Sequence, residues 1–148
     1  MLVKSVKVAD YMSTRLITVH REDSVAEAMA VLLTRKISGA PVVDDAGKLV
    51  GVLSEKDLME VIIQDSYYDE NMGIVADYMR EEVDTVDPDT DIYTLAERFH
   101  KEHRRRYPVV KNGRLLGQIS RRDVLRAAEE FLMHTDGLSN RKRKKMLG

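Results

Sequence analysis

The side chains in this sequence best suited to chemistry are two serine–aspartate pairs that share one pattern. Ser54 and Asp57 lie in the stretch GVLSEKD, and Ser120 and Asp123 lie in the stretch GQISRRD. A serine at the end of a strand can cap the helix that follows, and the helix dipole favours an aspartate in the first turn. The structural interpretation is therefore that each pair begins a helix.

The same geometry also suits a sugar phosphate. A helix N-terminus offers free backbone N–H groups to an anion. A carboxylate beside it is a good acceptor for the two hydroxyls of a ribose, as in dinucleotide sites. A serine hydroxyl can reach a phosphate. The functional hypothesis is that each pair holds a ribose phosphate, and both interpretations stay open at this point.

The two pairs belong to a longer internal repeat. The stretch ADYM occurs at 9–12 and at 76–79, Thr-Val at 18–19 and 85–86, and Pro-Val-Val at 41–43 and 108–110. After a gap of one residue, Gly47, Leu49, Gly51, Ser54 and Asp57 match Gly113, Leu115, Gly117, Ser120 and Asp123. We divide the chain into a first repeat (1–66), a second repeat (67–136) and a basic tail (137–148), with a polar connection at 64–73.

The sequence pattern of each repeat predicts secondary-structure elements in the order strand, helix, strand, turn, strand, helix. In the first repeat we expect strands at 17–19, 39–43 and 49–54, a helix that begins at Ser24, and a second helix over 57–63. Gly47 and Gly113 are typical of turns. The helix stripe consists of Val25, Ala28, Met29, Leu32 and Leu33, and the second repeat keeps it with Ile92, Leu95, Ala96 and Phe99. Because 60 residues bury little surface alone, we expect the two repeats to share one core.

Composition and charge narrow the functional classes. The chain has 148 residues, 43% apolar and 33% charged, and contains no cysteine, so thiolate chemistry and disulfides are excluded. The first repeat has a net charge of −2, the second −4 and the tail +5. This acidic body is unlike a nucleic-acid-binding domain, so nucleic acid is expected at most at the tail. No apolar run suits a membrane span or a signal peptide, which predicts a cytoplasmic protein.

The order and duplication of these motifs resemble a pair of CBS domains, the tandem repeats that form a Bateman module. The resemblance covers about residues 8–130. It implies an α/β fold of the α+β kind, in which two βαββα repeats pack sheet to sheet with pseudo-two-fold symmetry. It also implies that clefts between the repeats bind adenosine-containing ligands, with AMP, ADP or ATP favoured here over S-adenosylmethionine and no further cofactor required.

The resemblance assigns candidate site residues in both repeats. The ribose-binding aspartate of the family falls on Asp57 and Asp123, and its hydroxyl partner on Ser54 and Ser120. In the family, the adenine pocket uses one residue of the first strand of each repeat. It also uses the backbone at and just before the proline of the repeated Pro-Val-Val stretch. These positions are Thr18, Gly39 and Ala40 in the first repeat, and Thr85, Arg106, Tyr107 and Pro108 in the second.

The second repeat is richer in arginine near these positions. Arg105 and Arg106 stand where the first repeat has Ser38 and Gly39, and Arg122 lies inside the second serine–aspartate pair. Because a guanidinium can bind two phosphate oxygens at once, we expect the phosphates here and Asp123 to be the better ribose ligand. The alternative is a solvated basic face. Tyr107 is either a wall for the base or a core residue.

We therefore expect a stand-alone, non-catalytic sensor that binds an adenine nucleotide, forms a homodimer and acts on an unidentified protein. The alternative is an interaction module with a vestigial nucleotide site, whose basic tail binds a protein or nucleic acid. Because the two repeats and the tail account for these 148 residues, we expect no catalytic activity. His100 and His103 have a spacing that could bind a metal, but no third ligand accompanies them.

Overall fold

A computed structural model describes residues 6–64 and 72–135, with side chains described as far as Phe131. The polar connection and the basic tail lie largely outside the described residues. The first repeat contains α1 (Val8–Tyr11), β1 (Val19–His20), α2 (Val25–Arg35), β2 (Gly39–Val43), β3 (Leu49–Ser54) and α3 (Glu55–Ile63). The second contains η2 (Val75–Asp77), α4 (Ile92–Glu102), β4 (Arg106–Lys111), β5 (Arg114–Ser120) and α5 (Arg121–Thr135).

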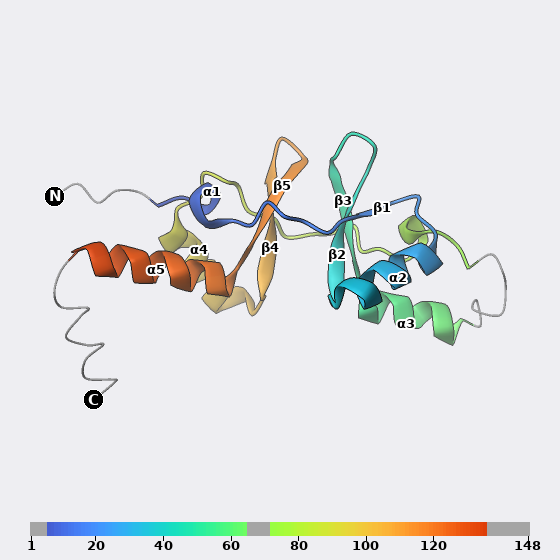
Figure 1. The fold of residues 1–148 in the computed structure, drawn as a ribbon. Helices are drawn as coiled ribbons and strands as arrows, with labels where there is room; N and C mark the ends of the chain where they lie inside the picture. Colours follow the sequence, from blue (N-terminus) through green and yellow to red (C-terminus); the bar gives the residue numbers. More distant parts are fainter. Residues whose placement is uncertain (1–5, 65–71, 136–148) are drawn as a thin grey trace, which may run out of the picture.

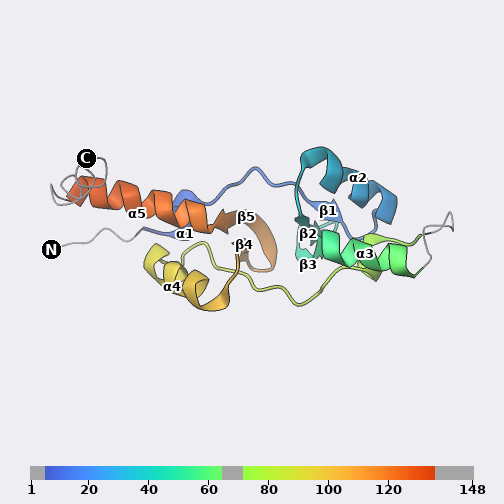
Figure 2. The ribbon, with the colours of Figure 1, turned by 90° about the horizontal axis from the view of Figure 1, so that it is seen from below.

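The two repeats have matching sheets. Strand β1 pairs in parallel with β2, and β2 pairs antiparallel with β3. In the second repeat β4 and β5 form the equivalent hairpin, and a parallel bridge between Val86 and Val109 takes the place of β1. The first strand is thus shorter than predicted and begins at Val19 rather than at residue 17. Figures 1 and 2 show the two hairpins in the middle of the molecule, with α2 and α3 on one side and α4 and α5 on the other. The α+β class is confirmed.

The helix that was predicted to begin at Ser24 is confirmed. The backbone N–H of Glu27 donates to Ser24 Oγ at 3.1 Å, and Val25, Ala28 and Leu32 are buried. Leu33 was wrongly placed in the stripe, because it is 73% exposed. At 3.6 residues per turn, its position is about 80° away from that of Val25, so it lies at the solvent side of the apolar face.

The two repeats exchange their opening segments. Ser13 and Gln118 exchange backbone hydrogen bonds of 2.8 and 2.9 Å, so residues 6–13 pack on the second repeat. In the same way Arg80 and Val52 exchange two bonds of 2.9 Å, so residues 72–80 pack on the first repeat. Figure 1 shows α1 beside α5 and the β4–β5 hairpin. Each repeat therefore receives part of its structure from the other.

The expectation of one shared core is wrong. The buried residues form two clusters, one in each repeat, and each cluster contains a valine from the exchanged segment. Val8 is fully buried against the core of the second repeat, and Val75 is fully buried against that of the first. The exchange supplies the apolar surface that a repeat of this size lacks alone.

The exchange also explains the glycine of the repeated motif. A Cβ at Gly51 would lie 2.8 Å from the backbone oxygen of Arg80, and a Cβ at Gly117 would lie 2.8 Å from that of Ser13. Only a residue without a side chain lets the exchanged segment approach this closely.

The tips of the two hairpins bind each other directly. Leu49 donates its N–H to the carbonyl of Gly113 at 3.0 Å, and Leu115 donates to that of Gly47 at 3.2 Å. Both glycines have positive φ values, 79° and 80°, which confirms them as turn glycines. These bonds tie the repeats together beside the space between their sheets. None of the described helices is long and apolar enough to cross a membrane.

Candidate functional site

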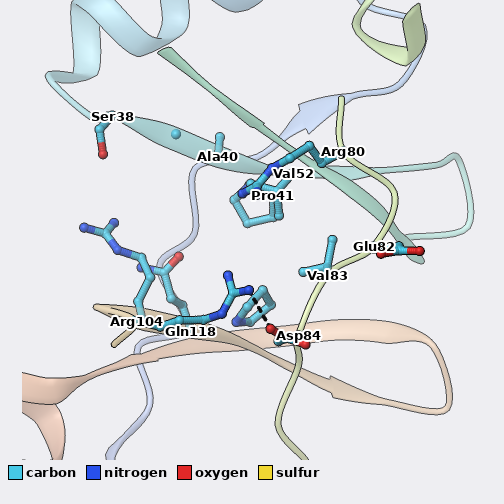
Figure 3. Close-up of a pocket in the computed structure, with 13 residues that line it drawn as sticks. Ser38, Ala40, Pro41, Val52, Arg80, Glu82, Val83, Asp84, Arg104 and Gln118 are labelled. Carbon is cyan, nitrogen blue, oxygen red and sulfur yellow. Dashed lines mark ion pairs between the residues drawn. The ribbon is translucent and has the colours of Figure 1, made fainter. Parts of the chain in front are cut away.

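A pocket of about 180 Å³ lies between the two hairpins, on the side where residues 80–84 cross from one repeat to the other. Figure 3 shows Ser38, Pro41 and Val52 on one wall and Gln118 on the other. The lining residues are Ser38, Gly39, Ala40, Pro41, Val52, Arg80, Glu82, Val83, Asp84, Arg104, Arg106, Pro108 and Gln118. Both repeats and the crossing segment thus contribute to one pocket.

Strand alternation decides which side chains reach this pocket. Successive residues of a strand point to opposite faces. In β4, Tyr107 and Val109 point into the core of the second repeat, which leaves Arg106 and Pro108 to line the pocket. The sheet faces that turn away from the two cores therefore form the walls.

The pocket contains both signs of charge. Arg104 Nη2 lies 2.6 Å from Asp84 Oδ2, and this ion pair is drawn in Figure 3. Arg80 and Arg106 make no ion pair with any residue that the structure describes, and Glu82 makes none either. Two arginines are therefore available to an anion at once, and a third is held by a carboxylate.

The first serine–aspartate pair forms a reciprocal cap at the start of α3. The N–H and the hydroxyl of Ser54 both donate to Asp57 Oδ2 at 2.8 Å, and the N–H of Asp57 donates to Ser54 Oγ at 3.2 Å. Within the described residues, Asp57 Oδ1 has no partner. The structural interpretation of the motif is confirmed, and it leaves one carboxylate oxygen open.

The second pair forms the same cap but differs at the other oxygen. Ser120 donates to Asp123 Oδ2 from its N–H at 2.8 Å and from its hydroxyl at 3.0 Å. Arg126 Nη2 lies 2.5 Å from Asp123 Oδ1. Burial raises the pKa of Asp123, but the hydrogen bonds from Ser120 and Arg126 outweigh it and hold the pKa below its ordinary value. In the first repeat the residue equivalent to Arg126 is Glu60.

Backbone bonds connect both caps to the strands that border the pocket. The N–H of Glu55 donates to the carbonyl of Ser38 at 2.9 Å, and Gly39 is opposite Ser54 in the sheet. On the other side, the N–H of Arg121 donates to the carbonyl of Arg105 at 3.2 Å. Each aspartate therefore starts a helix next to the end of a strand that approaches the pocket.

Tyr107 is a core residue, so its ring cannot form a wall for a base. The side chain is fully buried, its ring centroid lies 4.7 Å from that of Phe99, and its hydroxyl donates to Glu102. Arg98 lies over the ring, with Cζ 4.4 Å from the centroid. Burial and the hydrogen bond to Glu102 raise the pKa of Tyr107 to about 12. Only its backbone is left to border a ligand.

Arg98 also fixes the backbone at Thr85, just after the segment that crosses between the repeats. Its Nη1 donates to the backbone carbonyl of Thr85 at 2.6 Å, and its Nε donates to Glu102 at 2.8 Å. Thr85 follows Asp84 directly, so this bond holds one end of the pocket wall. The first repeat has Val31 at the position of Arg98 and lacks this restraint.

The structure brings four of the predicted site residues into the pocket lining: Gly39, Ala40, Arg106 and Pro108. The lining does not include Thr18, Ser54, Asp57, Thr85, Arg105, Tyr107, Ser120, Arg122 or Asp123. Sequence reasoning missed Arg104, although it belongs to the same basic run as Arg105 and Arg106. It also missed the crossing segment with Arg80, Glu82 and Asp84, which has no counterpart in a motif.

The metal spacing of His100 and His103 can be checked only against the part of the chain that the structure describes. In residues 6–64 and 72–135 no group of three or more histidine, aspartate or glutamate side chains is arranged to hold a metal ion.

Comparison with known families defines the class of the protein. The CBS domain model matches residues 8–64 and 75–130. The chain belongs to the CBS domain family and carries two CBS domains in tandem. The resemblance drawn from the repeated motifs is thereby confirmed.

Solved structures of CBS pairs match nearly the whole chain. CBSX2 from Arabidopsis thaliana, a CBS-pair protein, is 30% identical, with a TM-score of 0.74 over 89% of this chain and 100% of that one. A structure of CBSX2 in complex with AMP is 33% identical, with a TM-score of 0.70 over 84% of this chain and 96% of that one. The CBS domain pair of protein MJ0100, in complex with methylthioadenosine and S-adenosylmethionine, is 27% identical, with a TM-score of 0.65 over 83% and 99%.

Curated relatives carry the same region within longer chains. The chain is 32% identical over 126 residues to the A-adding tRNA nucleotidyltransferase of Aquifex aeolicus, of which it spans 15%. It is 33% identical over 126 residues to the inosine-5'-monophosphate dehydrogenase of Methanocaldococcus jannaschii, of which it spans 24%. The chain therefore covers less than half of these relatives, and the match does not transfer their reactions to it.

Proposed function

We propose that this protein is a non-catalytic regulatory module that binds an adenine nucleotide, AMP or ATP, between its two CBS repeats. The observation that carries the proposal is the arginine-lined pocket between the hairpins, in a chain that matches an AMP complex over 84% of its length. Apolar walls formed by Pro41, Val52 and Val83 suit an adenine ring, and guanidinium groups suit a phosphate.

The role of each residue follows from its position. Gly39, Ala40 and Pro108 border the base, with Thr85 at the end of the crossing segment. Arg80, Arg104 and Arg106 face the phosphate. We retain Arg105 and Arg122 as phosphate contacts, and Thr18 as a base contact, for a second site on the pseudo-symmetric side of the module.

We assign the ribose contact to Asp57, with Ser54 as its hydroxyl partner, in the site that binds nucleotide first. Asp57 has a carboxylate oxygen without a partner in the described structure, whereas that of Asp123 is bound to Arg126. A ribose diol needs a free acceptor, so binding at Asp123 and Ser120 must first displace an ion pair. This reverses the expectation that Asp123 is the better ribose ligand.

Nucleotide binding changes the relative arrangement of the two repeats, and this change is the signal to a regulated protein. A ligand shifts a conformational equilibrium only if it binds the two states with different affinities. A nucleotide that contacts both hairpins favours the arrangement in which both walls reach it. The links that transmit this change to a regulated protein are the crossing segment 80–84 and the bonds between the hairpin tips.

We also propose that the chain forms a homodimer. Helices α3 and α5 expose apolar side chains, with Ile63 77% and Leu125 69% exposed, and such faces suit a second copy of the same surface. Sedimentation equilibrium should give twice the mass of the chain, and a monomer mass at micromolar concentration contradicts this.

The proposed function is tested by calorimetric titration. AMP, ATP and S-adenosylmethionine are titrated into protein that has been shown by denaturation and chromatography to carry no co-purified nucleotide. Saturable binding of AMP or ATP, tighter than that of S-adenosylmethionine, is expected. Absence of saturable heat for all three ligands contradicts the proposal.

A further inference from the structure

The pocket contains an ion pair that its pseudo-symmetric counterpart lacks. Asp84 lies on the crossing segment, and its Oδ2 is 2.6 Å from Arg104 Nη2. Both residues line the pocket, and Figure 3 shows the pair within it. The equivalent positions in the first repeat are Ile17 and Ile37. The ion pair between Asp84 and Arg104 therefore occurs on this side of the module and has no equivalent on the other.

We infer that Asp84 sets the charge selectivity of the pocket by competing with ligand phosphate for Arg104. The inference rests on the proposed nucleotide site and specifies which ligands it takes. A phosphate that reaches Arg104 must replace the carboxylate, and each additional negative charge on the ligand meets the carboxylate of Asp84 as well.

The exposure of the pair makes this exchange feasible. The side chains of Arg104 and Asp84 are 44% and 48% exposed. Ion pairs exposed to this degree contribute little stability, so a phosphate with two oxygens for the guanidinium can replace the carboxylate. Neither side chain is part of a core cluster, so neither must break packing to move.

The balance of charge in the pocket points to ligands of low charge. Three arginines, Arg80, Arg104 and Arg106, line the pocket together with Glu82 and Asp84. A monophosphate is matched by the two arginines that have no ion pair within the described residues. A longer phosphate chain needs Arg104 too, and therefore needs Asp84 to withdraw. Asp84 thus favours AMP over ATP.

The experiment compares four probes, adenosine, AMP, ATP and inorganic pyrophosphate, by calorimetry at constant ionic strength. Asp84→Asn removes the charge and keeps the size of the side chain. Glu82→Gln is the matched control. Glu82 lines the same pocket but makes no ion pair with an arginine within the described residues. Arg104→Leu and the double variant Asp84→Asn/Arg104→Leu complete a double-mutant cycle.

With Asp84→Asn we expect AMP to bind about five-fold more tightly, since one repulsive charge is removed at close range. The gain should be larger for ATP, and adenosine should change by no more than about two-fold. Glu82→Gln should give less than half of the gain, and most of the gain should vanish in the Arg104→Leu background.

Unchanged or weaker binding of AMP and ATP by Asp84→Asn overturns the inference, since Asp84 would then only position Arg104. If adenine nucleotides fail to bind the wild type while pyrophosphate binds Asp84→Asn more tightly, the proposed function fails and the charge selectivity stands. If no probe binds any variant, both fail.

Discussion

At the scale of single residues, the two repeated aspartates have the same capping role but differ in whether their second carboxylate oxygen is bound. Asp57 and Asp123 each accept two bonds from the preceding serine through Oδ2. They differ because the next turn of the helix has Glu60 in one repeat and Arg126 in the other. A residue outside the motif therefore decides which aspartate has an open oxygen.

The first prediction concerns these carboxylates. Asp57→Asn should weaken AMP binding by roughly ten-fold to a hundred-fold, because a hydrogen bond to a charged group is lost. Asp123→Asn should weaken the first binding event much less. The control is Asp10→Asn, since Asp10 accepts from the N–H of Lys7 in a similar cap on α1. Equal losses for Asp57→Asn and Asp123→Asn in calorimetric titrations contradict the assignment.

The second prediction concerns pH. The pKa of Tyr107 is raised to about 12, so the neutral form is favoured in the folded state. The stability that this contributes is fully present below the unfolded pKa near 10 and is lost as the pH rises towards 12. The loss is on the order of 2 kcal/mol.

The measurement is the free energy of unfolding in urea between pH 8 and pH 12. At pH 8, Tyr107→Phe should cost about 1 kcal/mol, because the bond to Glu102 is lost. As the pH rises from about 10 to 12 this deficit should shrink and then change sign, because the wild type loses on the order of 2 kcal/mol that Tyr107→Phe does not lose. The control is Tyr93→Phe, whose ring is 72% exposed and which should match the wild type throughout. A constant deficit across the range contradicts the account.

The candidate residues could be predicted only in part. The capping role of the serines and aspartates could be predicted because their spacing is that of helix caps and occurs twice. Tyr107 was ambiguous because an aromatic side chain can either line a ligand pocket or pack in a core, and the sequence does not say which face of β4 is buried. Asp84 gave no signal, because its role comes from a distance of 2.6 Å to Arg104, twenty positions away in sequence.

At the scale of elements, periodicity predicted the main helices and hairpins, but it could not predict which repeat each opening segment joins. The segments at 9–12 and 76–79 have the same sequence, ADYM, so either could pack on either hairpin by pattern alone. Each crosses to the other repeat, where its backbone pairs with the second strand of the hairpin at Gln118 or Val52.

The third prediction tests this exchange. Gly117→Ala should reduce the free energy of unfolding by about 1–3 kcal/mol, because the added Cβ would lie 2.8 Å from the backbone oxygen of Ser13. Gly51→Ala should have a similar cost through Arg80. Because the two contacts are in different cores, the costs should add in the double variant. Denaturant unfolding measures all three, and variants as stable as the wild type contradict the close approach.

At the scale of the whole molecule, the exchange makes each repeat dependent on the other. The core of the first repeat contains Val75, which belongs to the second, and the core of the second contains Val8, which belongs to the first. The sequence suggested a single shared core because two short units need each other for stability. The structure meets the same need with two cores and exchanged segments.

The fourth prediction concerns separated repeats. A fragment of residues 1–66 and a fragment of residues 67–148 should each show little cooperative unfolding, because each lacks the valine that completes its core. Mixing them should restore a cooperative transition and helical circular dichroism. A cooperative transition in either fragment alone shows that the exchanged segment is dispensable and contradicts the account.

The pocket between the hairpins is the central feature at this scale, and filling it is the most direct test. Ser38 is exposed and lines the pocket, so Ser38→Trp should occupy the space without disturbing either core. Thr34→Trp adds the same ring at an exposed position of α2 outside the pocket lining. The measurement is calorimetric titration of AMP into the wild type and both variants. We predict saturable binding by the wild type and by Thr34→Trp, and loss of the first, tighter binding event in Ser38→Trp. A first binding event that survives unchanged in Ser38→Trp, or no binding by the wild type, contradicts the claim that this pocket binds an adenine nucleotide.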